Sequence, residues 1–148
     1  MCIHNIQFTT FVSLFLAAFD PETLRLTYSN AGHNPPMLIR GSADARDAIE
    51  WLSPTGAAVG LTDDSSYEDE SISLTIGDLL VLYTDGLTEA TNPLGDFFGP
   101  EGLAALVRRN ASLSAHDLVH AIREGLEDFA AGATQADDVT VMVMRVVD

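Results

Sequence analysis

Two groups of acidic residues stand at the ends of strongly apolar segments. Asp85 lies just past the end of the apolar segment Leu79–Tyr83, while Asp137 and Asp138 lie just before the apolar segment Val139–Val147. If both segments are buried antiparallel strands that lie side by side, the end of one lies beside the start of the other. The sequence therefore predicts that these carboxylates converge at one edge of a sheet, where buried strands hold them rigidly.

Carboxylate oxygens gathered in this way favour a hard cation such as Mg²⁺ or Mn²⁺. A simpler interpretation is also open, because Asp is common in the turns at strand ends. The sequence contains no GxSxG motif, no Walker loop and no CxxC pair, so the common nucleophile, nucleotide and zinc signatures are absent.

Three further polar residues are weaker candidates. His33 lies in the Gly-, Asn- and Pro-rich segment Asn30–Pro36, where it could donate a proton or contact phosphate, or could simply bond to the local backbone. Glu89 and Asn92 follow Asp85 and could orient water or substrate, or could be exposed loop residues. The acidic run from Asp63 to Glu70 is interpreted as a solvated edge that discourages strand pairing.

Composition excludes several classes of function. The chain has 148 residues, 22 of them acidic and only seven basic, all Arg, for a net charge of −15. Such acidity argues against nucleic acid and an anionic membrane surface as partners. The single cysteine, Cys2, favours a reducing, cytoplasmic compartment. The apolar segment Phe11–Phe19 is too short to span a bilayer, and no basic residue precedes it as in a signal peptide.

Hydrophobic periodicity predicts a mixture of strands and helices. Phe11–Phe19 reads as a strand covered on both faces, joined to the next strand by a hairpin across Asp20–Thr23. The further expected strands are 24–28, 37–40, 49–52, 71–76, 79–83 and a central strand 139–147, with 71–76 and 79–83 paired as a hairpin. The expected helices are Glu101–Arg109 and Ala115–Ala130, the second capped by Ser114. This order favours an α+β fold with antiparallel sheet.

An ordered series of short motifs resembles a known family. The motifs are Asn30-Ala31-Gly32-His33-Asn34-Pro35-Pro36, then Gly77-Asp78 leading through Leu80-Val81-Leu82-Tyr83-Thr84-Asp85-Gly86-Leu87-Thr88-Glu89-Ala90, then Asn92-Pro93, Phe97-Phe98-Gly99 and Asp137-Asp138-Val139-Thr140. Each motif is weak alone, but their order and spacing from Phe11 onward are similar to the SpoIIE-type branch of the metal-dependent PPM protein phosphatases. That branch includes phosphatases that regulate stress and sporulation sigma factors.

The resemblance implies a fold and a mechanism. The implied fold is an antiparallel β-sandwich flanked by helices, with a centre of two Mn²⁺ or Mg²⁺ ions whose bridging water attacks phosphoserine or phosphothreonine. Asp85 and Asp137 would be metal ligands, and Gly86 would let the backbone pass close to the metal. Asp138 would help to hold the ligand Asp137 in place without binding the metal itself, and no metal role transfers to His33.

One departure from the family pattern limits this expectation. The family's N-terminal portion carries further metal-binding aspartates in Gly-Asp-x-x-Asp and Asp-x-x-Gly-His-Gly motifs, and neither motif occurs in this sequence. We therefore expect residues 1–148 to form one partial phosphatase domain that begins at a middle strand. We expect it to expose apolar surface around Phe11–Phe19 and to form a homo-oligomer.

The expected partner is a phosphorylated signalling protein such as an anti-sigma factor antagonist. Two alternatives remain open on the sequence alone. The chain could be a catalytically inactive phosphatase remnant that acts as a binding or dimerisation module, or it could be an unrelated α+β binding domain.

Overall fold

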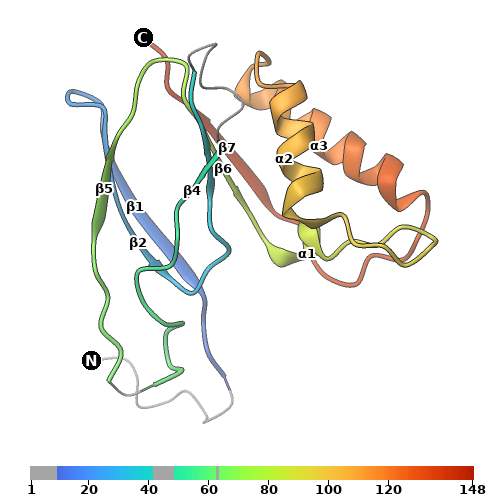
Figure 1. Cartoon of the computed structure of the whole chain (residues 1–148), viewed down its shortest axis with the longest axis horizontal. Helices are drawn as coiled ribbons and strands as arrows, with labels where there is room; N and C mark the ends of the chain where they lie inside the picture. The colour runs from blue at the N-terminus through green and yellow to red at the C-terminus, as the bar shows by residue number, and fades with distance from the viewer. Residues whose placement is uncertain (1–9, 42–48, 63) are drawn as a thin grey trace. The chain divides into compact units, whose positions relative to one another are not determined.

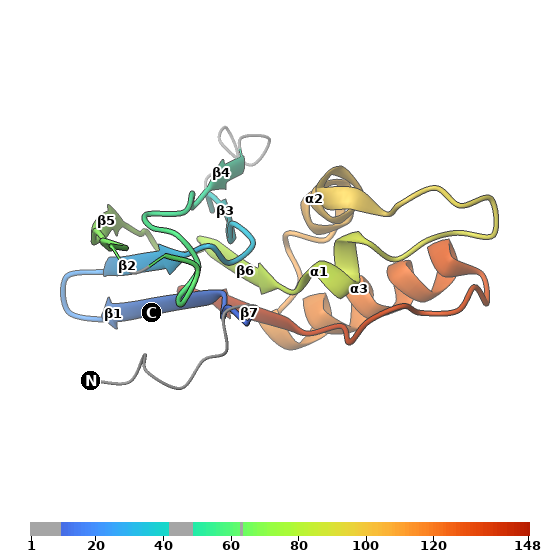
Figure 2. The same ribbon diagram turned by 90° about the horizontal axis from the view of Figure 1, so that it is seen from below.

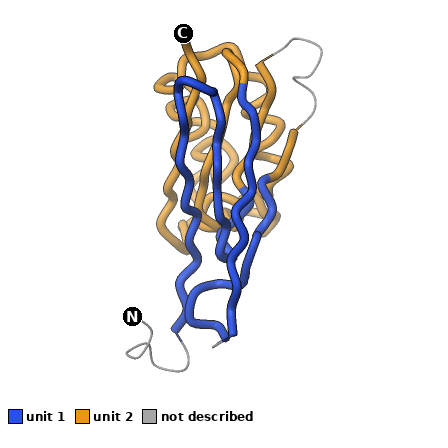
Figure 3. Tube along the Cα trace, turned by 90° about the vertical axis from the view of Figure 1, so that its left-hand side faces the viewer, with its two compact units in different colours: residues 1–35, 52–74 blue, residues 36–51, 75–148 orange. Residues whose placement is uncertain are grey.

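The structure, a computed structural model, describes residues 10–41, 49–62 and 64–148 (Figures 1 and 2). The chain divides into two compact units (Figure 3). Unit 1 comprises residues 1–35 and 52–74, and unit 2 comprises residues 36–51 and 75–148.

Unit 1 contains a three-stranded antiparallel sheet in the order β1-β2-β5. Its strands are β1 (Leu14–Asp20), β2 (Arg25–Ala31) and β5 (Glu70–Ser73). The predicted hairpin between β1 and β2 is confirmed, with Asp20 opposite Arg25. The Asp20 carboxylate holds the turn, because it accepts hydrogen bonds from the Glu22 N–H (2.9 Å) and the Thr23 hydroxyl (2.7 Å).

The expectation that the first strand is covered on both faces is wrong for this chain. β1 is an edge strand of its sheet, and every residue in it except the half-buried Phe15 is exposed. Phe15 stacks on Tyr28 of β2 with ring centroids 5.4 Å apart. The apolar side chains of β1 therefore form an exposed surface that no other described residues cover.

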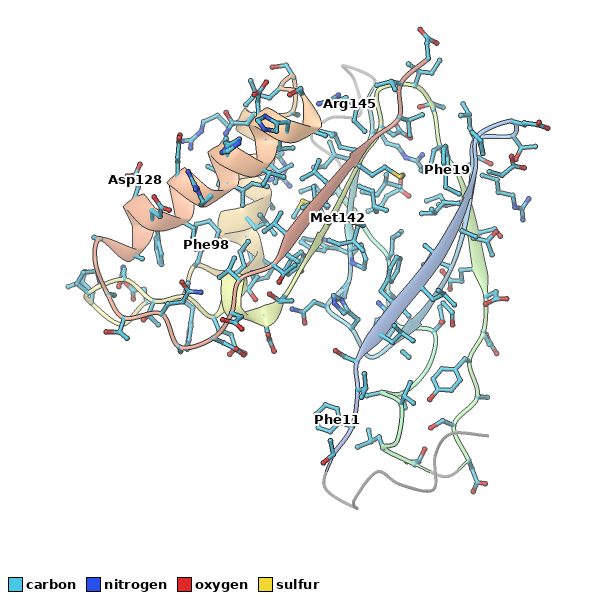
Figure 4. All side chains as sticks on the ribbon, turned by 180° about the vertical axis from the view of Figure 1, so that it is seen from behind. Phe11, Phe19, Phe98, Asp128, Met142 and Arg145 are labelled. Atoms are coloured by element: carbon cyan, nitrogen blue, oxygen red, sulfur yellow. The ribbon has the colours of Figure 1, made fainter. Side chains whose placement is uncertain are left out.

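Unit 2 contains a four-stranded antiparallel sheet in the order β4-β3-β6-β7. Its strands are β3 (Met37–Ile39), β4 (Ile49–Trp51), β6 (Leu79–Tyr83) and β7 (Val141–Arg145). β6 is an interior strand and is buried at four of its five positions. β7 was expected to be central, but it lies at the edge of the described sheet, with Met142 exposed (Figure 4).

The predicted hairpin across Gly77-Asp78 is also wrong, because β5 pairs with β2 whereas β6 pairs with β3 and β7. Local packing explains the difference. A Cβ built on Gly41 would lie 2.5 Å from the Gly77 carbonyl carbon, so the two glycine backbones are in close contact. The Asp78 carboxylate accepts hydrogen bonds from the N–H groups of Gly41 (2.7 Å) and Thr75 (2.9 Å). These contacts bind the turn to the segment after β3 rather than folding it into a two-residue hairpin.

The helices of unit 2 are α1 (Asp85–Thr88), α2 (Gly99–Arg109) and α3 (Ala115–Ala130). The Ser114 hydroxyl caps α3 by accepting a hydrogen bond from the Asp117 N–H (3.1 Å), as the sequence predicts. The apolar faces of α2 and α3 share one core with β3 and β6; its fully buried members include Met37, Val81, Leu103, Val107, Leu118 and Ile122.

The predicted fold class is confirmed as a mixed α+β fold with two antiparallel sheets. Within residues 10–41, 49–62 and 64–148, no helix is both long enough and apolar enough to traverse a lipid bilayer.

Candidate metal centre

The end of β6 and the segment leading into β7 meet at one edge of the unit 2 sheet. Tyr83 is paired with Val141, and beyond this pair the Thr84 N–H donates to the Thr140 carbonyl (3.1 Å). The Thr84 hydroxyl accepts from the Thr140 N–H (2.9 Å) and donates to the Asp138 carbonyl (3.0 Å). The predicted antiparallel arrangement of these two segments is therefore present.

Gly86 is the point of closest approach between them. It is buried in the first turn of α1, and a Cβ built on it would lie 2.5 Å from the Asp138 carbonyl oxygen and 3.2 Å from the Asp137 carbonyl carbon. Such a contact is far shorter than packed atoms tolerate, so only glycine fits here without displacement of the backbone. The absence of a side chain lets the turn after β6 rest directly on the Asp137-Asp138 peptide.

Asp85 and Asp137 have similar local environments. Each side chain is exposed, and each Oδ1 accepts a hydrogen bond from the next N–H in the chain, Gly86 (3.0 Å) and Asp138 (2.7 Å) respectively. These bonds restrict the carboxylates while leaving their other oxygen atoms available to a ligand. Asp138 is also exposed, and its backbone makes the contacts to Thr84 and Gly86.

These residues suit a hard cation in kind but not in number. Because Gly86 has no side chain, the turn that carries Asp85 lies directly against the backbone of Asp137 and Asp138. Carboxylate oxygens are the ligands that Mg²⁺ and Mn²⁺ prefer. However, across the described parts of the chain, no three His, Cys, Asp or Glu side chains are grouped closely enough to hold a metal ion. Within the described residues, the acidic edge therefore does not by itself form a metal-binding group.

A cavity of about 740 Å³ opens beside this edge within unit 2. Apolar side chains of α3 form much of its wall, and the charged side chains of Arg123 and Glu127 also line it. The remaining wall comes from Leu87 of α1, from Gln135 and from residues 138–141. It is large enough to receive a side chain or a short peptide segment next to the acidic edge.

His33 makes hydrogen bonds only with residues of its own loop among the described contacts. The His33 Nδ1 lies 3.0 Å from the Asn34 carbonyl oxygen, and the His33 N–H donates to the Asn30 Oδ1 (2.8 Å). Asn30 is completely buried and donates through Nδ2 to the Leu52 carbonyl (3.2 Å). The loop histidine thus bonds to the local backbone, the simpler of the two interpretations.

Asn92 likewise organises its own loop. Its Oδ1 accepts from the N–H groups of Leu94 and Asp96, both at 2.9 Å, and its Nδ2 donates to the Asp96 carboxylate (3.0 Å). Glu89 is exposed at the end of α1, where its N–H donates to the Asp85 carbonyl (2.8 Å). Within the described residues, the hydrogen bonds of the Asn92 side chain stay inside its own loop.

Thr84 is the residue that sequence reasoning missed. Its hydroxyl makes both side-chain hydrogen bonds that join the end of β6 to the segment before β7. The available signal was a hydroxyl residue directly before the acidic residue at a strand end, but Thr is common there for other reasons.

An α+β fold with two antiparallel sheets is shared with solved PP2C phosphatase domains. The SiaA-PP2C domain of Pseudomonas aeruginosa superposes with a TM-score of 0.76 at 23% identity, covering 90% of this chain and 51% of that domain's chain. At this identity the likeness concerns the fold.

The chain belongs to the SpoIIE family, described as stage II sporulation protein E, whose model matches residues 2–147. Among curated relatives, protein IcfG of Synechocystis is 31% identical over 90% of this chain. Phosphoserine phosphatase RsbU of Bacillus subtilis is 28% identical over 95% of it. The chain spans only 20% of IcfG and 41% of RsbU. Family membership excludes the reading of an unrelated α+β binding domain.

Proposed function

We propose that this chain is part of a metal-dependent phosphoprotein phosphatase domain that hydrolyses phosphoserine or phosphothreonine on a signalling protein. The observation that carries the proposal is the contact of Gly86 with the Asp137-Asp138 peptide, which joins two acidic strand ends at one sheet edge. The relationship to RsbU, which is named a phosphoserine phosphatase, favours an enzyme over the alternative of an inactive binding module.

In this proposal Asp85 and Asp137 are metal ligands. Asp138 and Thr84 fix the position of Asp137, since the Thr84 hydroxyl binds the Asp138 carbonyl (3.0 Å). A bound Mn²⁺ or Mg²⁺ pair would supply an activated water and neutralise charge on the phosphoryl oxygens. The chain's own task is to present two carboxylates rigidly and to receive the substrate chain in the neighbouring cavity.

The substrate and setting are part of the proposal. An anti-sigma factor antagonist or a similar small phosphoprotein is the expected substrate, and the cytoplasm is the expected compartment, given the single cysteine. The exposed apolar residues of β1 support self-association into a homo-oligomer. The partial domain over residues 1–148 would rely on further family aspartates for full activity.

The test is hydrolysis of a phosphate ester and of a phosphoserine peptide, with and without Mn²⁺. It compares the 148-residue chain with the same chain extended upstream by the family region that carries the Gly-Asp-x-x-Asp and Asp-x-x-Gly-His-Gly motifs. The proposal expects little or no turnover from the short chain and Mn²⁺-dependent turnover from the extended chain. Turnover in the extended chain that does not depend on metal would contradict it.

A further inference from the structure

A histidine pair lies on α3, outside the acidic edge. His116 and His120 are four residues apart, so they lie on the same face of the helix, one turn from each other. Both side chains are exposed, and their Nε2 atoms are 3.3 Å apart, with ring centroids at 4.5 Å. The two Nε2 atoms therefore lie next to each other on the exposed surface of the helix.

This separation suits a tetrahedral metal ion. Two imidazole nitrogens that each lie 2.0–2.1 Å from a tetrahedral zinc ion are themselves about 3.3–3.4 Å apart. The two nitrogens already lie at this separation, and the rings need only turn so that both Nε2 atoms face an ion beside the line that joins them. Imidazole is a ligand for Zn²⁺ rather than for the hard cations that carboxylates bind.

A carboxylate fixes the orientation of the first ring. His116 Nδ1 lies 3.4 Å from Asp117 Oδ1, and the Ser114 hydroxyl holds the other oxygen, Oδ2, at 2.7 Å. A proton on Nδ1 that points to Asp117 leaves the lone pair of Nε2 free for a metal, the arrangement usual for zinc-bound histidine. In His120 the proton of the ring must then reside on Nδ1 as well, which neutral imidazole permits, so zinc binding would replace the hydrogen bond between the two Nε2 atoms.

We propose that His116 and His120 form a two-histidine site for Zn²⁺ on the exposed face of α3, oriented by Asp117 and completed by water. The site is separate from the acidic edge in both residues and ligand chemistry, so it stands whether or not the phosphatase proposal holds. Mg²⁺ in excess does not occupy it, because Mg²⁺ prefers oxygen ligands and retains its waters.

The experiment is a calorimetric titration of Zn²⁺ into the 148-residue chain in excess Mg²⁺. It uses a Cys2→Ser, His4→Ala background, since those two side chains are also zinc ligands by type. We expect one zinc per chain. His116→Ala and His120→Ala should each abolish saturable binding, and both positions are exposed, so neither change should unfold the helix.

Two further variants separate the proposed site from nonspecific binding. Asp117→Asn should weaken zinc binding about tenfold, because it removes the carboxylate that orients His116. His33→Ala, at a histidine bonded to its own loop, should leave zinc binding unchanged. On adding zinc, the ¹⁵N resonances of the His116 and His120 rings should move together. No saturable binding by the parent chain, or equal binding by both histidine variants, would overturn the proposal.

Discussion

Asp78 shows how a single buried carboxylate organises unit 2. Its side chain is fully buried and accepts hydrogen bonds from Gly41, from both donors of Thr75, and from Arg40 Nη1 at 3.0 Å. Burial alone would raise the pKa of Asp78, but the hydrogen bonds from Gly41, Thr75 and Arg40 together hold it below the ordinary value of 3.8. Arg40 is further tied to Glu50 by a 2.7 Å ion pair.

Replacing Asp78 should therefore destabilise the fold in a pH-dependent way. We expect Asp78→Asn to lower the free energy of unfolding by about 2–4 kcal/mol near neutral pH, because it removes the charge that Arg40 faces and one of the two oxygens that accept hydrogen bonds. Since the folded pKa is depressed, the stabilisation is present above pH 3.8 and is lost as pH falls through the lower folded pKa. Urea unfolding at several pH values should show the difference shrinking in acid, whereas exposed Asp128→Asn should have almost no effect. A difference that persists or grows in acid would contradict this.

Gly86 is the residue on which the acidic edge depends most directly. We expect Gly86→Ala to destabilise unit 2 by about 1–3 kcal/mol, because the new methyl group would meet backbone atoms of Asp138 that cannot move aside cheaply. In α2, Gly102→Ala is the matched control, since its new methyl would meet the Phe98 ring at 3.2 Å, a side chain that can shift. Thermal unfolding compares the stability of both variants with that of the parent chain. Equal stability of the parent and Gly86→Ala would show that the close contact between Gly86 and Asp138 is not required.

Among the elements, α3 could be predicted from sequence and the pairing of β5 could not. The helical spacing of Leu118, Ile122 and Leu126, with the Ser114 cap, is a local signal and gives the correct bounds. The partner of a strand is not a local property. Both β5 and β6 have strand-like patterns, and their different partners follow from contacts distant in sequence, such as the pairing of β5 with β2 and the contact of Gly41 with Gly77.

The cap of α3 offers a direct test of local stabilisation. Ser114→Ala removes the acceptor for the Asp117 N–H and should cost about 1 kcal/mol of unfolding free energy. Ser114→Asp should retain most of it, because a carboxylate also caps a helix. Denaturant unfolding of the two variants measures the difference, and an unchanged midpoint for Ser114→Ala would exclude the cap as a source of stability.

The β1 strand should govern association. Leu16 is 65% exposed in the edge strand β1, and Leu14 on the same face of that strand is also exposed. We expect the parent chain to self-associate in sedimentation velocity and Leu16→Glu to shift it toward monomer, because a charge disfavours burial of that face. Leu94→Glu, at an exposed loop position in unit 2, should leave association unchanged. A parent chain that sediments only as monomer would contradict the expectation.

At the scale of the whole molecule, the acidic edge could be anticipated because it needs only two neighbouring strands that run antiparallel. β6 and β7 meet that condition, and Asp85 and Asp137 follow from their positions. The exposure of β1 and β7 could not be deduced from hydrophobicity, since an apolar run has the same pattern whether or not anything covers it. The hydrogen bonds of Thr84 depend on side-chain geometry that spacing does not encode.

The incomplete donor set makes a prediction for metal binding. Two carboxylates supply few of the roughly six oxygen ligands that each hard cation requires. The 148-residue chain should therefore bind Mn²⁺ weakly and at no more than one site, and Asp85→Asn should remove that binding. Calorimetry or electron paramagnetic resonance can count the ions, and tight binding of two Mn²⁺ by this chain would show that the ligands have been misplaced.

The most direct measurement is Mn²⁺-dependent turnover of a phosphoserine substrate by the extended chain, compared with its Asp85→Asn variant. The substitution removes a charge at an exposed position, so circular dichroism and the unfolding midpoint should stay close to those of the parent. The account predicts that turnover is abolished while the fold is retained. Unchanged turnover by the Asp85→Asn variant would contradict the assignment of Asp85 and, with it, the proposed metal centre at this edge of the sheet.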